Sequence, residues 1–126
     1  MTRPGPSWQR LAVAGEIPAR GPLFTFRDGP FSSTGILLRG DGGVRAWRNE
    51  CRHLAVRLDR ETEGSLFDRD GALLMCQVHG ALYRPGDGVC IAGPCAGSRL
   101  CPLPVRELAG AVWLVCDELR PPLSDP

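Results

Sequence analysis

The sequence predicts an all-β fold made of short strands. With 16 glycines and 12 prolines among 126 residues, turns are frequent and long helices are disfavoured. Short runs rich in β-branched and other apolar residues alternate with turn-forming residues, which is typical of strands joined by hairpins. With 43% hydrophobic and 23% charged residues, the chain has the composition of one globular core. We expect a single domain over residues 1–120 and a C-terminal tail over residues 121–126.

Seven segments have the composition of strands. They are residues 8–13, 23–27, 34–39, 44–48, 72–77, 105–108 and 111–116. Asp41-Gly42-Gly43 predicts a hairpin between the third and the fourth of these segments, because Asp-Gly pairs favour tight hairpin turns. Asp70-Gly71 and Ala109-Gly110 precede the fifth and the last in the same way. One helical turn is expected over residues 54–60.

Charge and hydropathy exclude several classes of protein. The 15 basic residues, all of them arginine, nearly balance 14 acidic ones, so no basic stripe predicts binding to nucleic acid. The longest uncharged apolar run, residues 111–116, is far shorter than the roughly 20 residues of a membrane span. The first residues lead into no apolar secretion signal. We expect a cytoplasmic protein that binds neither nucleic acid nor membrane.

Two Cys/His pairs carry the chemistry of the chain. The sequence has only two histidines, and each follows a cysteine closely, as Cys51-x-His53 and Cys76-x-x-His79. Two thiolates and two imidazoles suit a tetrahedral zinc site or a 2Fe-2S cluster with both thiolates on one iron. Because each pair supplies both ligand types from one short loop, the cluster is favoured over zinc. The other cysteines, at 90, 95, 101 and 116, form no second site pattern and are expected to pack as small hydrophobic residues.

The residues after the pairs fit a cluster as well. Gly80 allows close approach of the backbone, and Gly93-Pro94 can form a rigid turn over the site. Together, Cys51-x-His53, Cys76-x-x-His79-Gly80 and Gly93-Pro94 resemble the signature of the Rieske family. The resemblance covers most of the chain, from residue 23 to residue 115.

The resemblance implies both the fold and the site. The implied fold has three antiparallel sheets, with a cluster-binding subdomain at about residues 49–97 inserted in a basal subdomain. Cys51 and Cys76 would bind the buried iron of one 2Fe-2S cluster, and His53 and His79 the outer iron. Leu54, Gly80, Tyr83, Gly93 and Pro94 would surround these ligands. Tyr83 stands where respiratory members place a tyrosine that donates to a ligand sulfur, and Ala81 stands where they place a serine.

Two departures from the respiratory members indicate a Rieske-type ferredoxin. Val56 and Val78 occupy the positions of their loop-bridging disulfide, and no membrane anchor is apparent. We therefore expect a disulfide-free, monomeric one-electron carrier with no activity alone, passing electrons from a reductase to an oxygenase or another oxidoreductase. Its reduction potential would lie in the broad range of about −150 to +300 mV that imidazole ligation gives. A fixed relay subunit of a larger oxidoreductase complex remains an alternative, as does a zinc-stabilised binding module.

Overall fold

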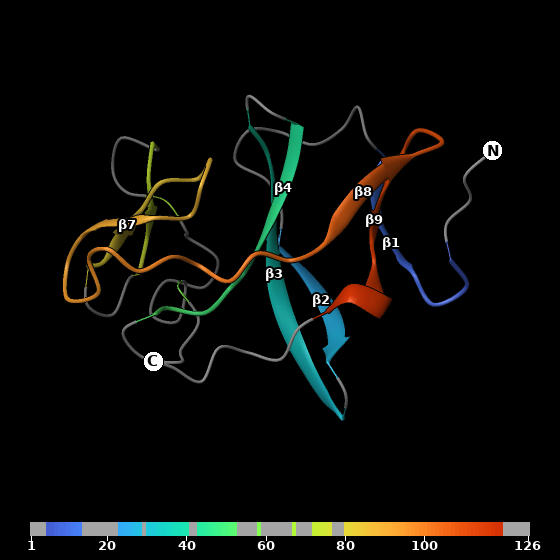
Figure 1. The fold of residues 1–126 in the computed structure, drawn as a ribbon, viewed down its shortest axis with the longest axis horizontal. Coiled ribbons are helices and arrows are strands. Elements are labelled where there is room, and N and C mark those ends of the chain that lie inside the picture. Colours follow the sequence, from blue (N-terminus) through green and yellow to red (C-terminus); the bar gives the residue numbers. More distant parts are fainter. Residues whose placement is uncertain are drawn as a thin grey trace. The chain divides into compact units, whose positions relative to one another are not determined.

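Among the residues that it describes, the computed structural model contains nine strands in three antiparallel sheets (Figure 1). It describes residues 5–13, 23–28, 30–40, 43–52, 58, 67, 72–76 and 80–119. Within these ranges the only helix is the short 3-10 turn η2, Cys116–Glu118. The all-β prediction, with three antiparallel sheets, is confirmed.

The chain divides into two compact units. The first comprises residues 1–47 and 102–126, and the second comprises residues 48–101. Within each unit, a backbone hydrogen bond joins two residues that lie at or near the unit boundaries. In the first unit Leu103 N–H donates to the Ala46 carbonyl at 2.9 Å, and in the second Arg48 N–H donates to the Cys101 carbonyl at 2.8 Å. The inserted segment thus begins and ends at neighbouring points.

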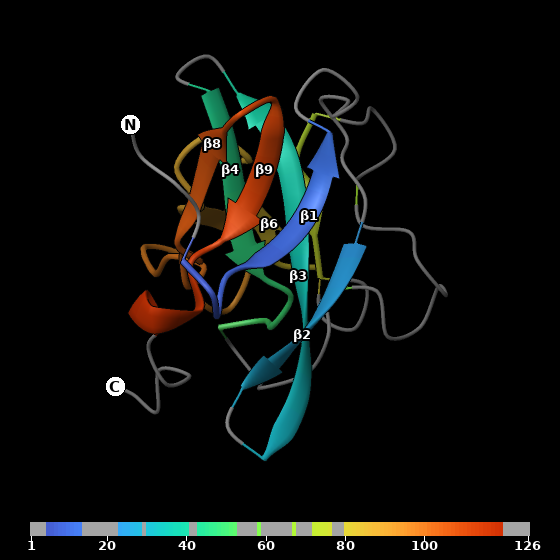
Figure 2. The same ribbon diagram turned by 90° about the vertical axis from the view of Figure 1, so that its right-hand side faces the viewer.

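The first unit contains two three-stranded sheets. One has the order β1-β9-β8, and its strands lie side by side in Figure 2. The other has the order β2-β3-β4. The bounds are Gln9–Val13 for β1, Leu23–Asp28 for β2, Phe31–Gly40 for β3, Gly43–Arg48 for β4, Val105–Leu108 for β8 and Ala111–Leu114 for β9.

The β8–β9 hairpin follows directly from its turn residues. Ala109 and Gly110 have φ values of 54° and 78°. Two central residues with positive φ give a turn whose twist matches that of the flanking strands. The register then pairs Leu108 with Ala111 and Val105 with Leu114. The predicted strand over residues 111–116 ends at Leu114, because the chain turns into η2 immediately after Val115.

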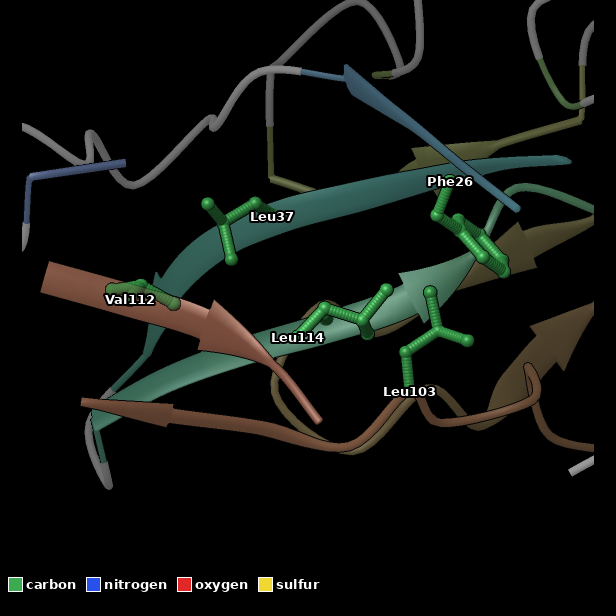
Figure 3. Close-up of a cluster of buried hydrophobic side chains, with 6 residues drawn as sticks. Phe26, Leu37, Leu103, Val112 and Leu114 are labelled. Atoms are coloured by element: carbon green, nitrogen blue, oxygen red, sulfur yellow. The ribbon is translucent and has the colours of Figure 1, made fainter. Parts of the chain in front are cut away.

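A hydrophobic cluster joins the two sheets of the first unit (Figure 3). Phe26, Leu37 and Ala46 come one each from β2, β3 and β4, whereas Val112 and Leu114 come from β9. Leu103, just before β8, completes the cluster, and all six are at most 5% exposed. Burial of this apolar surface is the main stabilising contribution to the unit.

The second unit contains one small sheet of order β5-β6-β7. Its strands are Leu74–Met75, Leu82–Tyr83 and Cys90–Ala92. The sequence predicted a longer strand over residues 72–77 and neither β6 nor β7. Segments of two or three residues are too short to show a period-2 pattern, and backbone bonds from neighbouring turns stabilise them instead.

Several expectations fall on residues that the structure does not describe. They are the turn residues Asp41-Gly42 and Asp70-Gly71, the tail over 121–126, and the helical turn over 54–60 except for Leu58. The subdomain expected at about residues 49–97 falls within the second unit, which comprises residues 48–101. Among the described residues, no helix is long and apolar enough to cross a membrane.

Candidate metal centre

Two buried thiols lie in the second unit, each shortly after a strand. Cys51 follows β4 and is 3% exposed, whereas Cys76 follows β5 and is fully buried. Buried cysteines are inert unless a metal or a positive environment stabilises the thiolate. Each strand therefore presents a protected sulfur at the start of the loop that also carries a histidine in the sequence.

A buried amide closes the first loop. The Asn49 side chain is 4% exposed, and its Oδ1 accepts a hydrogen bond from Leu58 N–H at 2.9 Å. This contact joins the two ends of the segment that contains Cys51. The role of Asn49 could not be predicted from the sequence, because nothing local marks an asparagine as the partner of a backbone group nine positions away.

Two backbone hydrogen bonds close the second loop. Cys76 N–H donates to the Ala81 carbonyl, and Gly80 N–H donates to the Cys76 carbonyl, each at 2.8 Å. Gly80 has φ +74°, which side chains rarely adopt, and a Cβ there would meet nothing within 4 Å. Its conformation rather than crowding therefore favours glycine at this exposed position.

The Gly93-Pro94 turn lies directly against the second loop. Gly93 has φ +100°, and a Cβ on it would lie 2.7 Å from the Cα of Ala81. Real side chains essentially never approach backbone so closely, so the turn can pack here only with glycine. Pro94 is exposed on the turn, which a hydrogen bond from Ala96 N–H to the Gly93 carbonyl closes at 3.2 Å.

Tyr83 contacts the first cysteine. Its side chain is fully buried in the small sheet, and Oη lies 3.3 Å from Cys51 Sγ. Oη also accepts from Arg52 N–H at 2.9 Å and lies 3.1 Å from Cys95 Sγ. Burial, with the contacts to both sulfurs, raises the pKa of Tyr83 well above its usual value. The hydroxyl therefore remains protonated and available as a donor.

Cys90 and Cys95 form a second pair of thiols, of which Cys95 contacts Tyr83. Cys95 Sγ lies 3.4 Å from Cys90 Sγ, and Cys90 donates to the Ala92 carbonyl at 3.1 Å. Burial and the hydrogen bond with Cys95 raise the pKa of Cys90 to about 11. Burial disfavours the thiolate of Cys95, but hydrogen bonds with Tyr83 and other neighbours outweigh it and lower its pKa. The expectation that these two cysteines only fill space missed this network.

Comparison with known proteins decides the family. The family model of the Rieske [2Fe-2S] domain matches residues 7–109, which is most of the chain. The chain belongs to the Rieske family. The resemblance drawn from the two Cys/His pairs is confirmed, and a Rieske domain implies one 2Fe-2S cluster and a role in electron transfer.

This Rieske chain is similar to a curated oxidoreductase and to a curated oxygenase subunit. Oxidoreductase NdmD of Pseudomonas putida is 32% identical over 84% of this chain and 18% of its own length. The glycine betaine monooxygenase oxygenase subunit of Pseudomonas aeruginosa is 28% identical over 94% of this chain and 28% of its own length. The chain therefore spans less than a third of these curated relatives.

Solved structures have the same fold. The terminal oxygenase of carbazole 1,9a-dioxygenase from Novosphingobium sp. KA1 has a TM-score of 0.61 and 26% identity, over 85% of this chain and 29% of its own. A chain from the complex of reduced oxygenase and oxidized ferredoxin in carbazole 1,9a-dioxygenase also scores 0.61, at 21% identity. That match covers 86% of this Rieske chain and 92% of the other, and at this identity it shows the fold alone.

The described residues fit a Rieske cluster on the thiolate side. Thiolates are the ligands that iron–sulfur clusters require, and both Cys51 and Cys76 are protected from solvent. The Tyr83 hydroxyl lies within hydrogen-bonding distance of one of these sulfurs. All six cysteines are free thiols, so no disulfide withdraws either ligand.

The imidazole side of the predicted site lies outside the described residues. His53, Leu54 and His79 belong to that part of the chain, as do Val56 and Val78. Among the residues that are described, no group of three or more His, Cys, Asp or Glu side chains lies close enough to hold a metal ion. The four-residue ligand set therefore stays a prediction.

Proposed function

We propose that this Rieske chain is a one-electron carrier whose 2Fe-2S cluster is held by Cys51, His53, Cys76 and His79. It would receive an electron from a reductase and pass it to an oxygenase or another oxidoreductase. The observation that carries the proposal is the pair of buried thiols, each shortly after a strand and each followed within three positions by one of the two histidines. The names of the relatives support the oxygenase context.

When bound, a cluster of this kind accepts and releases single electrons without breaking bonds in a substrate. The chain's own residues would protect and position it. Cys51 and Cys76 keep their sulfurs away from water, which stabilises thiolate ligands against oxidation. The Asn49 amide and the backbone bonds of Gly80 restrain the two loops.

Electrons would enter and leave at the imidazole side. Imidazole ligands can present their free N–H edges to a partner, whereas the two cysteine sulfurs are buried. Gly80 and Pro94, both exposed, would border this tip together with Leu54. A small apolar patch suits transient redox encounters, which bury less area than stable complexes. We infer no catalytic activity for the chain alone.

A second candidate function is a fixed electron relay within a larger oxidoreductase. The observation that favours it is that the chain spans only 18% and 28% of its curated relatives. Size-exclusion chromatography of the endogenous protein, with iron detected in each fraction, separates the two. Iron eluting with a mass near 13.6 kDa supports the monomeric carrier, and iron eluting only with a much larger mass supports the relay.

A cytoplasmic location completes the proposal. Its support is the set of six cysteines, all of which are free thiols, since reducing compartments keep thiols unpaired. Fractionation of source cells, with the protein detected by antibody in the cytoplasmic and the membrane fractions, tests this location.

Ligand substitutions test the site. Cys51→Ser and His79→Ala should each lose the visible chromophore and the acid-labile sulfide of the purified protein, and should lower its melting temperature, because metal binding and folding are coupled. Cys116→Ser is the matched control, since Cys116 lies in the first unit and should keep a full cluster. A full complement of iron and sulfide in Cys51→Ser and His79→Ala would refute the assignment, and stoichiometric zinc without sulfide in the parent protein would support the zinc module.

A further inference from the structure

Two cysteines outside the proposed ligand set lie almost in bonding distance of each other. Cys90 Sγ, on β7, and Cys95 Sγ, on the turn that follows, are 3.4 Å apart. A disulfide requires about 2.05 Å, so the two sulfurs would have to approach by about 1.4 Å in total. One glycine with positive φ, Gly93, lies between the two cysteines, and a second, Gly97, follows Cys95. A Cβ on Gly97 would meet nothing within 4 Å, so no side chain crowds the backbone on that side of Cys95.

The hydrogen-bonding capacity of Tyr83 connects this pair to a ligand. A phenol hydroxyl donates once and accepts twice. Arg52 N–H occupies one acceptor site of Oη. If Cys51 is a metal ligand it is a thiolate and can only accept, so the Tyr83 hydrogen must point to Cys51 Sγ. The single hydrogen of Cys95 then has two neighbouring acceptors, Oη at 3.1 Å and Cys90 Sγ at 3.4 Å, and the phenol oxygen is the nearer and the stronger of the two. In this arrangement Cys95 S–H donates to Oη.

The result is a directed chain of hydrogen bonds. Cys95 S–H donates to Tyr83 Oη, and Tyr83 O–H donates to Cys51 Sγ. Hydrogen bonds in series polarise one another in a buried environment, and each strengthens the next. The thiol form of Cys95 therefore strengthens the bond that Tyr83 makes to the ligand sulfur.

We propose that Cys90 and Cys95 form a reversible dithiol–disulfide switch that lowers the reduction potential of the cluster when it is oxidised. The inference rests on the proposed function, since it takes Cys51 as a cluster ligand. In the disulfide, Cys95 no longer has an S–H to donate, so Tyr83 becomes a weaker donor to Cys51. A weaker donor stabilises the reduced, more negative state less, and the potential falls.

A low-molecular-weight disulfide such as oxidised glutathione supplies the oxidising equivalents. Cys95 is partly exposed and Cys90 is 2% exposed, so Cys95 reacts first. Its sulfur attacks one glutathione sulfur, the S–S bond breaks, and one glutathione leaves as a thiol, which carries one of the two protein protons. Cys90 then attacks Cys95 Sγ in the mixed disulfide and releases the second glutathione as a thiol with the other proton. Two protein thiols are oxidised and one disulfide is reduced.

The experiment equilibrates the purified holoprotein with oxidised glutathione. Peptide mapping by mass spectrometry detects the Cys90–Cys95 bond, and voltammetry measures the potential of the same sample. We expect the disulfide to form and the equilibrium constant for reduction to fall about threefold, which is roughly 28 mV for one electron. Dithiothreitol should reverse both changes.

Three variants separate the steps. Cys90→Ala keeps the Tyr83–Cys95 contact and should retain the parent potential while its Cys95 accumulates as a mixed disulfide with glutathione. Cys95→Ala should form no disulfide and should have the lower potential without any oxidant. Cys116→Ser, in the other unit, should behave as the parent does.

Two results would overturn the switch. If Cys90 and Cys95 both remain free thiols at equilibrium with excess oxidised glutathione, the pair is not redox-active. If the disulfide forms and the potential is unchanged, the pair does not act on the cluster. Failure of the proposed function is distinguishable from both, because a parent protein without iron or sulfide would still report the state of the two thiols by mass.

Discussion

Replacing Tyr83 by Phe removes one oxygen atom and all three of its contacts. The ring stays in place, because Phe has the same shape and the site is fully buried. Cys51 Sγ, the proposed ligand sulfur, loses a donor at 3.3 Å, and Arg52 N–H loses the contact with Oη at 2.9 Å. The variant therefore tests the hydrogen bond itself rather than the packing around it.

The magnitude follows from the value of a hydrogen bond to a charged group, about 1.5–3 kcal/mol. If about half of this depends on the added electron, the equilibrium constant for reduction falls by about three- to tenfold, which is roughly 30–60 mV. Loss of the contact with Arg52 N–H should also cost about 1 kcal/mol of folding free energy, the net value of an ordinary hydrogen bond. Because the pKa of Tyr83 is raised, the phenol stays protonated up to at least its usual value of about 10. The difference in potential between Tyr83→Phe and the parent should therefore be constant over neutral pH.

Voltammetry of the two holoproteins measures the difference, with their visible spectra as the check that both retain the cluster. Cys116→Ser provides the control for a substitution that leaves this network intact. An unchanged potential in Tyr83→Phe with a complete cluster would refute the reasoning. A rise in potential would refute it equally, because removing a donor can only destabilise the more negative state.

The remaining predictions concern stability and tuning. Gly93→Ala should lower the free energy of unfolding by more than the roughly 1 kcal/mol of an ordinary glycine effect, since its Cβ would lie 2.7 Å from Ala81 Cα; urea denaturation measures this. Leu114→Ala should cost about 2–5 kcal/mol in the same assay, because Leu114 is fully buried in the core of the first unit. Ala81→Ser should raise the reduction potential if its hydroxyl donates to the cluster, and voltammetry would detect the change. The Asp87 carboxylate accepts a hydrogen bond from Val89 N–H, which lowers the pKa of Asp87. The free energy of unfolding of the parent should therefore exceed that of Asp87→Asn above about pH 3.9, and the difference should disappear as acid protonates Asp87.

The fold class could be predicted because its signals are local. The β8–β9 hairpin needs only the Ala109-Gly110 turn and the apolar strands beside it. The strands β6 and β7 could not be predicted in this way. They are two and three residues long, and hydrogen bonds such as that from Cys90 N–H to the Ser98 carbonyl, rather than a hydrophobic period, position them.

The candidate site likewise has residues that the sequence predicts and residues that it does not. Spacing alone marked Cys51 and Cys76, because each lies next to a histidine in the sequence. The roles of Asn49 and Cys95 depend on contacts across the second unit, with Leu58 and Tyr83 respectively. Such contacts are set by tertiary structure, and no composition or motif predicts them.

The way the second unit begins and ends has a consequence for how such proteins can be assembled. Its first and last residues, Arg48 and Cys101, are joined by a hydrogen bond of 2.8 Å. A segment whose ends already meet adds almost no loop-closure entropy to the chain that receives it. It can be exchanged as a cassette between hosts that offer two adjacent, paired backbone positions, like Ala46 and Leu103 here. A chimera in which the equivalent segment of another Rieske chain replaces residues 48–101 should therefore fold with the strand register of the first unit unchanged.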